Sequence, residues 1–518
     1  MPLYYYQVTG WRSHVTRLPD SNIPRPTDQV AHILWDYLAE DGLLTLTLGI
    51  LPCGASYLLT PATRDMNREL QRLFTGRAYP ATRFAALSPV EFRDVQTLRA
   101  KLDRHQQKSK KSKRHEPDRD LSQANTHYTT GREPDVLTSE GRDRVMFEYH
   151  RLFYRLCRAS IDSEEYDIKR VPFFDNIRAY SLAYTVHIPS QWRHLDERRR
   201  NPVLLDLGYA EWILPASSMD MTAVGGDYYK IKENSRLKNP GVAQGAYLYG
   251  EGQEATQQDL RERLPLLFDR KLDAPIMLFV HNAEEAMDVL RFYGVDTTGW
   301  TTAFEPLVGK DVLRVGERYP PDDRAKAEGE RGRYTDRYHG RPTDRHGDRH
   351  ARERTKFDRS RSRSPRRDAH TPRPRSPPPR GNAHPVYVVD VAHLYATMRR
   401  IPIEPSLTVA SLADDLEVAL EQPEGTAPFT AGQWLVALIW QALVRGNAID
   451  DQLLCLQARP ARAPVRHVAQ APPAAPAPAA GGWDDDADPN DILAAPRPAG
   501  QRPSDPYDDF ENDDFEED

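Results

Sequence analysis

The sequence predicts an α/β protein in which a mixed β-sheet is flanked by helices, with a long insert and tails that are expected to be disordered. Three observations predict this. From about residue 202 onward, apolar runs of strand length alternate with longer runs of helical periodicity. The 518 residues include 43 prolines and 28% charged residues, which is more than one packed globule of that length would hold. The net charge of -6 conceals a basic middle segment and an acidic C-terminal segment.

The N-terminal part, residues 1–100, is expected to form a small α/β region whose role the sequence does not reveal. The apolar spacing in DQVAHILWDYLAE predicts a helix, and LLTLTLGIL and ASYLL predict strands. SPVEFRDVQTLRAKL predicts a helix that opens with a capping box, because Glu91 follows Ser88 by three residues. Residues 101–135 are polar and basic and predict a disordered linker. Residues 138–200 predict a helical region, which begins with the apolar stripe in SEGRDRVMFEYHRLFYRLCRAS.

The central part, residues 201–310 and 385–446, predicts one domain. PVLLDLGYAEWIL is expected to be a buried strand, with MDMTAV and DYYKIKE as hairpin partners. A helix in ATQQDLRERLPLLFDRKL, a strand in APIMLFV and a helix in AEEAMDVLRFYGV follow, and VYVVDVAHLYATMRR reads as a strand running into a helix. LTVASLADDLEVALE and AGQWLVALIWQALVRG predict two more helices. The last is apolar on nearly all sides, so we expect it to be buried, with a partner surface as the alternative.

Three antiparallel strands followed by helix-covered parallel strands is the order of a ribonuclease-H-like fold. The segments LLDLGYAEW, DYYKIKEN with GAYLYGEG, FVHNAEEAMDVLRFYGVD and VYVVDVAHLY occur here in the order and spacing of a known group. On these segments the domain resembles the DEDDh exonuclease superfamily. Within it, the domain resembles the fungal family found at the C-terminus of the yeast good-for-full-DEAD-box-activity protein. The resemblance implies a site where several carboxylates hold two divalent metal ions that cleave a phosphodiester.

The first motif that the resemblance implies is an acid-x-acid strand end. Here Asp206 keeps the first acid and Gly208 replaces the second. Glu211 is nearby, but its odd offset from Asp206 puts it on the opposite face of a strand unless a bulge intervenes. Asp206 is therefore either a leftover polar residue or the ligand of a single metal ion.

The second and third motifs have lost their acids. His281 and Asn282 open the second motif, and Ala286 stands where the family has its metal-binding Asp. We expect His281 and Asn282 to cap the helix that follows, since Asn is a favoured cap. In the third motif Phe429 replaces the general-base His and Trp434 the last Asp. One carboxylate cannot hold two divalent ions, so we expect no catalysis, no cofactor and no metal site. Mg²⁺ or Mn²⁺ would matter only for residual activity.

Basic segments outside the predicted domain indicate nucleic-acid binding, with RNA favoured over DNA. The insert, residues 316–384, contains SRSRSP, which resembles the Arg/Ser segments of mRNA-handling proteins. Arginine and lysine bind phosphates and release counterions. The residues expected to contact nucleic acid are Lys108, Lys110, Lys111, Lys113, Arg114, Arg361, Arg363, Arg366 and Arg367. Phosphorylation at Ser360, Ser362 or Ser364 would weaken that binding. The alternatives are a solvated charged spacer for the insert, and a nuclear-localisation signal or plain linker for the lysine cluster.

The C-terminal segment, residues 460–518, is Pro/Ala-rich and then acidic, with fourteen acidic residues and two arginines beyond Trp483. It predicts a segment that covers the basic insert and competes with nucleic acid, a protein-binding segment, or a solubilising tail. The three cysteines, Cys53, Cys157 and Cys455, lie far apart and form neither a disulfide framework nor a metal motif. No apolar run approaches the length of a membrane span. We therefore expect an intracellular protein, in the nucleus or the cytoplasm or both, with no membrane partner.

Three functions remain open on these grounds. The favoured one is a catalytically defective exonuclease-like domain that acts as an RNA-binding or mRNA-related adaptor. The second is an active 3′ to 5′ exonuclease whose metal ligands have moved elsewhere. The third is a protein-interaction scaffold without nucleic-acid binding.

Overall fold

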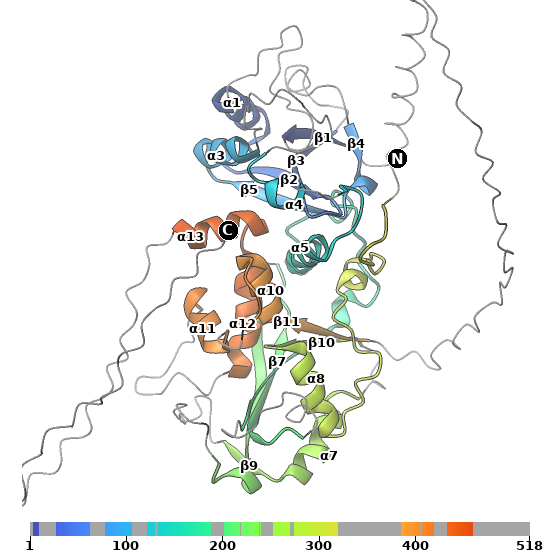
Figure 1. The fold of residues 1–518 in the computed structure, drawn as a ribbon, viewed down its shortest axis with the longest axis vertical. Helices are drawn as coiled ribbons and strands as arrows, with labels where there is room; N and C mark the ends of the chain where they lie inside the picture. The colour runs from blue at the N-terminus through green and yellow to red at the C-terminus, as the bar shows by residue number, and fades with distance from the viewer. Residues whose placement is uncertain are drawn as a thin grey trace, which may run out of the picture. The chain divides into compact units, whose positions relative to one another are not determined.

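The structure is a computed structural model, and the described residues belong to one compact unit, Met1–Arg459. They are residues 4–9, 27–62, 78–105, 122–129, 133–187, 201–217, 219–237, 239, 252–269, 274–319, 385–404, 407–418 and 432–458. The chain is an α/β protein with two β-sheets and helices packed on them (Figure 1). In this part of the chain no helix is both long and apolar enough to cross a membrane.

The first sheet is antiparallel, with the order β4-β1-β3-β2-β5. Its strands are β1 (Tyr4–Thr9), β2 (Leu44–Ile50), β3 (Ser56–Pro61), β4 (Ala78–Pro80) and β5 (Ala86–Phe92). Helices α1 (Thr27–Leu38) and α3 (Val95–His105) pack against each other beside this sheet (Figure 1). The short helix α4 (Thr126–Thr129) comes before α5 (Ser139–Cys157), which packs against β5.

The second sheet is mixed, with the order β11-β10-β6-β7-β8-β9. Its strands are β6 (Arg178–Val186), β7 (Leu204–Ile213), β8 (Thr222–Ile231), β9 (Gln253–Ala255), β10 (Ile276–Val280) and β11 (Val386–Asp390). Strands β6, β7 and β8 are antiparallel neighbours, whereas β10 runs parallel to both β6 and β11. Strands β10 and β11 pair residue for residue, although residues 281–385 separate them in the sequence.

Helices cover both faces of the second sheet (Figure 1). One face carries α7 (Gln257–Leu267) and α8 (Ala283–Phe292), whose apolar side chains share a core with Leu278 and Val280 of β10. On the other face lies α12 (Gly432–Arg445), against β6, β7 and β10. Helices α10 (Val391–Arg399) and α11 (Val409–Asp415) pack beside α12, and α13 (Ile449–Ala458) follows it. Side chains of successive strand residues point to opposite faces, which is why one strand feeds both cores.

Burial of the apolar helix predicted near the C-terminus is confirmed. In α12 the side chains of Val436, Ile439, Trp440 and Val444 are fully buried. Trp440 packs on Phe279 of β10 with ring centroids 4.9 Å apart. This helix lies between the sheet and helices α5, α10 and α11, which cover most of its surface.

The structure corrects the prediction of a helical region over residues 138–200. Helix α5 is present, but residues 178–186 form β6, between β7 and β10 in the second sheet. Consequently the strand that holds Asp206, β7, is the second antiparallel strand of this sheet and not the first. Residues 222–231 likewise form one continuous strand, β8, where two hairpin partners were expected.

The helix expected to open at Ser88 begins later. Residues 86–92 form β5, and the Ser88 hydroxyl donates to Glu148 Oε2 at 2.6 Å instead of capping a helix. Helix α3 begins at Val95, where the Asp94 carboxylate accepts a hydrogen bond from the Thr97 backbone N–H at 2.7 Å. Asp94 therefore acts as the cap that the sequence pattern assigned to Ser88.

Candidate functional site

The position of the expected second carboxylate, Gly208, faces helix α12. Gly208 lies on β7 opposite Ala183 of β6 and Tyr228 of β8. A Cβ built on Gly208 would lie 2.7 Å from the side-chain amide of Gln433. The Gln433 side chain, which is buried, therefore occupies the space of a residue larger than glycine.

Hydrogen bonds between neutral groups and aromatic packing surround Gly208. We call this region the Gly208 site, and it consists of Ser181, Gly208, Trp212, Gln433 and Trp434. The Ser181 hydroxyl donates to the Gln433 backbone oxygen at 2.5 Å and accepts from Trp212 Nε1 at 2.7 Å. The rings of Trp212 and Trp434 are 5.8 Å apart and inclined by 67°. Two of the sequence-predicted positions, Gly208 and Trp434, are thus brought together, and no carboxylate is among the five residues.

Asp206 lies two residues before Gly208 on β7, on the same face of the strand. Its backbone neighbours are Thr185 on β6 and Lys230 on β8. Burial raises the pKa of Asp206, and hydrogen bonds from Thr185 and Tyr228 and the charge of Lys230 favour its ionised form. Hydrogen-bond donors and one cation of the same sheet therefore stabilise the Asp206 carboxylate.

Glu211 points away from the Gly208 site, as its odd offset predicts. Tyr180, which belongs to the core under α7 and α8, donates to Glu211 Oε1 at 3.4 Å. Glu211 therefore lies on the opposite face of the sheet and cannot join Asp206 in holding an ion.

The second motif lies where β10 runs into α8. Asn282 is the N-cap of α8, and its side-chain oxygen accepts from the Glu285 backbone N–H at 3.1 Å, which confirms the capping role predicted for it. Ala286 is fully buried in the core between α8 and the sheet. Burial lowers the pKa of His281, which favours a neutral ring. The cap that was also expected from His281 is not confirmed, because its backbone oxygen accepts from the Ala392 N–H of α10 at 3.2 Å. None of these three positions offers an acidic ligand.

Sequence reasoning missed the role of Asp390, at the end of β11. One carboxylate oxygen accepts from the Ala283 N–H and the other from the His393 N–H, both at 2.9 Å. Asp390 therefore ties together the N-termini of α8 and α10, where the helix dipole also favours a negative charge. The signal was an acid directly between a β-branched strand and a helix, in VYVVDVAHLY.

The remaining sequence-predicted positions lie outside the described residues. These are Phe429, the lysine cluster Lys108, Lys110, Lys111, Lys113 and Arg114, the arginines Arg361, Arg363, Arg366 and Arg367, and the serines Ser360, Ser362 and Ser364. Among the residues that the structure does describe, no group of three or more His, Cys, Asp or Glu side chains could hold a metal ion. Asp206 with Lys230 beside it does not suit Mg²⁺ or Mn²⁺, which require several converging oxygen ligands.

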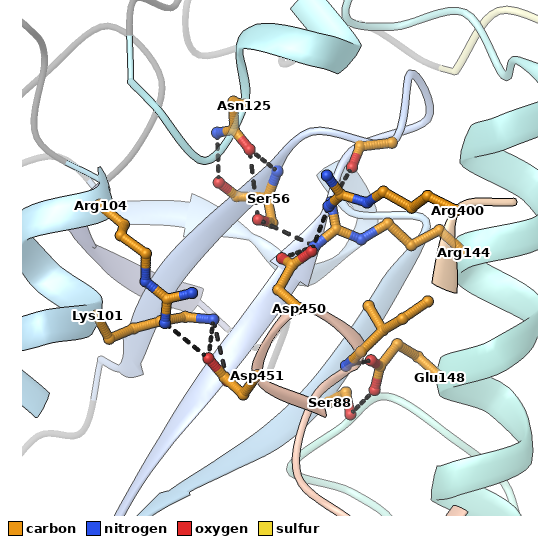
Figure 2. A network of polar contacts seen from close by, with 12 residues as sticks. Ser56, Ser88, Lys101, Arg104, Asn125, Arg144, Glu148, Arg400, Asp450 and Asp451 are labelled. Carbon is orange, nitrogen blue, oxygen red and sulfur yellow. Dashed lines mark hydrogen bonds and ion pairs between the residues drawn. The ribbon is translucent and has the colours of Figure 1, made fainter. Parts of the chain in front are cut away.

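A second polar region links α3, α5 and the end of α10 through two aspartates at the start of α13 (Figure 2). Asp450 pairs with Arg144 of α5 and with Arg400 at the end of α10, the latter at 2.7 Å. Asp451 pairs with Lys101 and Arg104 of α3 at 2.9 and 3.0 Å. We call these two aspartates and their four cationic partners the Asp450 junction.

Both aspartates of this junction are compensated, since each pairs with two cations. Although burial opposes it, the charges of Arg144, Lys101 and Arg400 hold the pKa of Asp450 well below its usual range. Glu148 of α5 is paired similarly with Arg151 and accepts from the Ile449 N–H at 2.9 Å. The sequence signal for the junction was an acidic pair in AIDDQ, opening a helix.

Beside the junction lies a pocket with a volume of about 690 Å³, lined by residues of α4, α5, α10 and α13 and by the loop after α10. Its polar lining includes His393, whose Nε2 lies 3.3 Å from the Asp143 carboxylate. The hydrogen bond from His393 to Asp143 raises the pKa of the imidazole. This pocket could not be predicted from local patterns, because α10 and α13 are far in the chain from α4 and α5.

Comparison with known proteins does not assign the chain to a family. No protein-family model matches the sequence, and no curated protein matches it.

Proposed function

We propose that this protein is a non-catalytic member of the ribonuclease-H-like, DEDDh-type nucleases that binds RNA as an adaptor. The observation that carries the proposal is the Gly208 site, which is closed by neutral side chains on the sheet face where a nuclease would place its acids. The order β8-β7-β6-β10-β11, with three antiparallel strands and then two parallel ones, supports the fold that the sequence resemblance implies.

The topology strengthens the argument against catalysis. In the resemblance, the paired acids stand on the first strand of the sheet, which by topology is β6. Its sequence, RAYSLAYTV, contains no Asp or Glu. Asp206, on the neighbouring strand, has Lys230 across from it instead of a second acid. Two metal ions about 4 Å apart need several carboxylates to hold and neutralise them.

RNA binding in this proposal rests on the basic segments. The first four residues of the predicted insert, 316–319, pair with residues 135–137 of the folded unit, so its expected start is corrected to a position after Tyr319. Strands β10 and β11 pair in register on either side of the insert. The segment from Arg331 to Asp368 has fourteen basic and six acidic residues. Such a segment binds phosphates without sequence preference, and its affinity falls with salt because counterions are released.

The test is the binding of a labelled single-stranded RNA across a salt series. We expect the full chain to bind, and the variant with Arg361, Arg363, Arg366 and Arg367 changed to Gln to bind more weakly. The slope of log K against log salt should fall by up to about 0.7 for each arginine that contacts a phosphate. The matched variant with the same four arginines changed to Lys should retain most of the affinity. Absence of RNA binding by the full chain would leave the scaffold function.

A nuclease assay tests the second part of the proposal, that the protein does not cleave nucleic acid. Labelled RNA and DNA should stay intact with the full chain in Mg²⁺ or Mn²⁺, for both the unchanged protein and Asp206→Asn. Metal-dependent digestion that Asp206→Asn abolishes would overturn the proposal and establish the active exonuclease.

A further inference from the structure

The pocket beside the Asp450 junction is separate from the Gly208 site. None of the residues that line it belongs to β7 or α12. It forms where α4, the first turn of α5, the end of α10 and the start of α13 meet. Its volume of about 690 Å³ is within the range of sites that hold small molecules.

One part of the lining is cationic. Asp450 is shared by Arg144 and Arg400, so one positive charge remains in this group of three. The acids of the lining itself, Glu140 and Asp143, lie beside His127 and His393 instead. Arg144 is buried and held by backbone and side-chain acceptors, whereas the Arg400 side chain is 39% exposed. Asp450 engages Nη2 of Arg400, and the guanidinium has further donors in the same plane. Arg400 therefore offers a bidentate face suited to a phosphate.

The ring of Tyr128 helps to orient both guanidinium groups. The guanidinium carbons of Arg144 and Arg400 lie 4.8 and 5.3 Å from the centre of its ring. Arg400 also has a left-handed backbone, with φ of 56°, as the residue that ends α10. Cation–π contacts and a fixed backbone reduce the freedom that Arg400 would lose on binding an anion.

Another part of the lining supplies acceptors and an apolar surface. Asp143 pairs with His393 and is 39% exposed, so its carboxylate can also accept from a ligand N–H. Directly after Arg400 come Ile401 and Ile403, whose side chains are 41% and 49% exposed. Large apolar side chains left exposed within a concave site indicate a ligand with an apolar face.

We propose that this pocket binds one nucleotide, with its phosphate on Arg400, an amino group of its base on Asp143 and the base plane against Ile401 and Ile403. Carboxylates accept hydrogen bonds from exocyclic amino groups of bases, which gives Asp143 a role in a pocket that also holds Arg400. The nucleotide can be free in solution or an unpaired unit of an RNA strand. The inference does not rest on the RNA-binding function proposed above, because its residues lie in the folded unit and not in the basic insert.

Titration calorimetry of the full chain with the four ribonucleoside monophosphates tests the proposal. We expect AMP, CMP and GMP to bind about tenfold more tightly than UMP, whose base has no amino group. Inorganic phosphate and the nucleosides should each bind more weakly than the nucleotide, since each uses only part of the lining.

Substitutions locate the site. Arg400→Gln should weaken nucleotide binding about tenfold and leave nucleoside binding nearly unchanged. Ile403→Ser, at an exposed position, should weaken both without unfolding the protein. Asp143→Asn should reduce the ratio by which AMP, CMP and GMP bind more tightly than UMP. The matched control is Arg445→Gln, which also removes an arginine paired with an aspartate but lies outside the pocket. It should bind like the unchanged protein.

Three results would overturn the proposal. These are no binding of any monophosphate at millimolar concentration, equal binding of UMP and GMP, or binding that Arg400→Gln and Ile403→Ser leave intact. A competition experiment then distinguishes a free nucleotide from a nucleotide of an RNA strand. Displacement of GMP by a short single-stranded RNA, also in the variant with the four insert arginines changed to Gln, supports an unpaired nucleotide of a strand. Retention of GMP supports a free nucleotide.

Discussion

The Gly208 site and the Asp450 junction handle buried polar groups in opposite ways. In the junction, each aspartate meets two cations that come from other elements, so charge is buried together with its compensation. At the Gly208 site, buried polar groups are neutral and satisfy one another, as Ser181, Gln433 and Trp212 do. A metal-dependent nuclease needs a third arrangement, in which several carboxylates converge and bind metal ions from solution. The junction places its two aspartates where cations of the same chain complete them, which is a structural use of charge.

Removing the central aspartate of the junction should have the largest effect. Asp450→Ala would leave the Arg144 guanidinium, which is only 2% exposed, without its carboxylate. Loss of one partner of a buried pair costs about 3–5 kcal/mol of unfolding free energy, measurable by urea denaturation. Asp175→Ala, which breaks an exposed pair with Arg170, should cost no more than about 0.5 kcal/mol. Equal losses in the two variants would show that the junction does not contribute as a buried pair.

Acid should lower the unfolding free energy through a buried neutral histidine of α5, the helix that also supplies Arg144. His150 of α5 is buried, and its Nδ1 accepts from Trp440 Nε1 at 3.3 Å, which requires an unprotonated nitrogen. Burial lowers the pKa of His150 from 6.5 to about 3. The unfolded chain therefore binds a proton that the folded chain excludes, and stability falls as the pH drops from 6.5 towards 3. At pH 5 the loss from this residue should be about 2 kcal/mol.

The comparison variant for that measurement is His150→Gln, which offers an acceptor that does not titrate. Its unfolding free energy should fall less steeply between pH 6.5 and 5 than that of the unchanged protein. His32→Gln, at an exposed position, should leave the slope as it is. Parallel curves for the unchanged protein and His150→Gln would contradict the assignment.

Adding a side chain at the Gly208 site should have an intermediate effect. Gly208→Ala places a methyl group against Gln433, and overpacking of this kind costs about 1–3 kcal/mol. The double variant Gly208→Ala with Gln433→Ala should recover part of the loss, because the second change removes the side chain in the way. A double-mutant cycle measured by urea denaturation gives this coupling. Strict additivity would mean that Gln433 is not what excludes a larger residue.

The smallest effect should come from one neutral hydrogen bond. Trp212→Phe removes the donor to the Ser181 hydroxyl and should cost about 1 kcal/mol more than Trp300→Phe. Within the described residues, Nε1 of Trp300 has no hydrogen-bond partner, so the second change removes a similar ring edge without a bond. Equal costs would indicate that ring packing alone holds Trp212.

Local patterns predicted the elements whose signals lie within a few residues. Helix α8 with its Asn282 cap, helix α5 and the buried α12 have the expected type and place. Strand β6 was missed because RAYSLAYTV carries polar side chains that are satisfied only across the sheet. Ser181, for example, is bonded to Trp212 and to Gln433, which is 252 residues away. Ser88 misled in the same way, since its partner Glu148 lies 60 residues on.

The sequence by itself determined the residue type at each position. Gly208, Ala286 and Trp434 carry no carboxylate, whatever the fold places around them. Only the tertiary structure decided what fills those positions and where the remaining charges act. Gln433 meets Gly208, Asp450 meets Arg144 and Arg400, and the pocket lined by Asp143 and Arg400 forms between helices distant in sequence. The reason is physical: residue type is a local property, whereas burial, charge compensation and a cavity depend on contacts between segments that local periodicity does not encode.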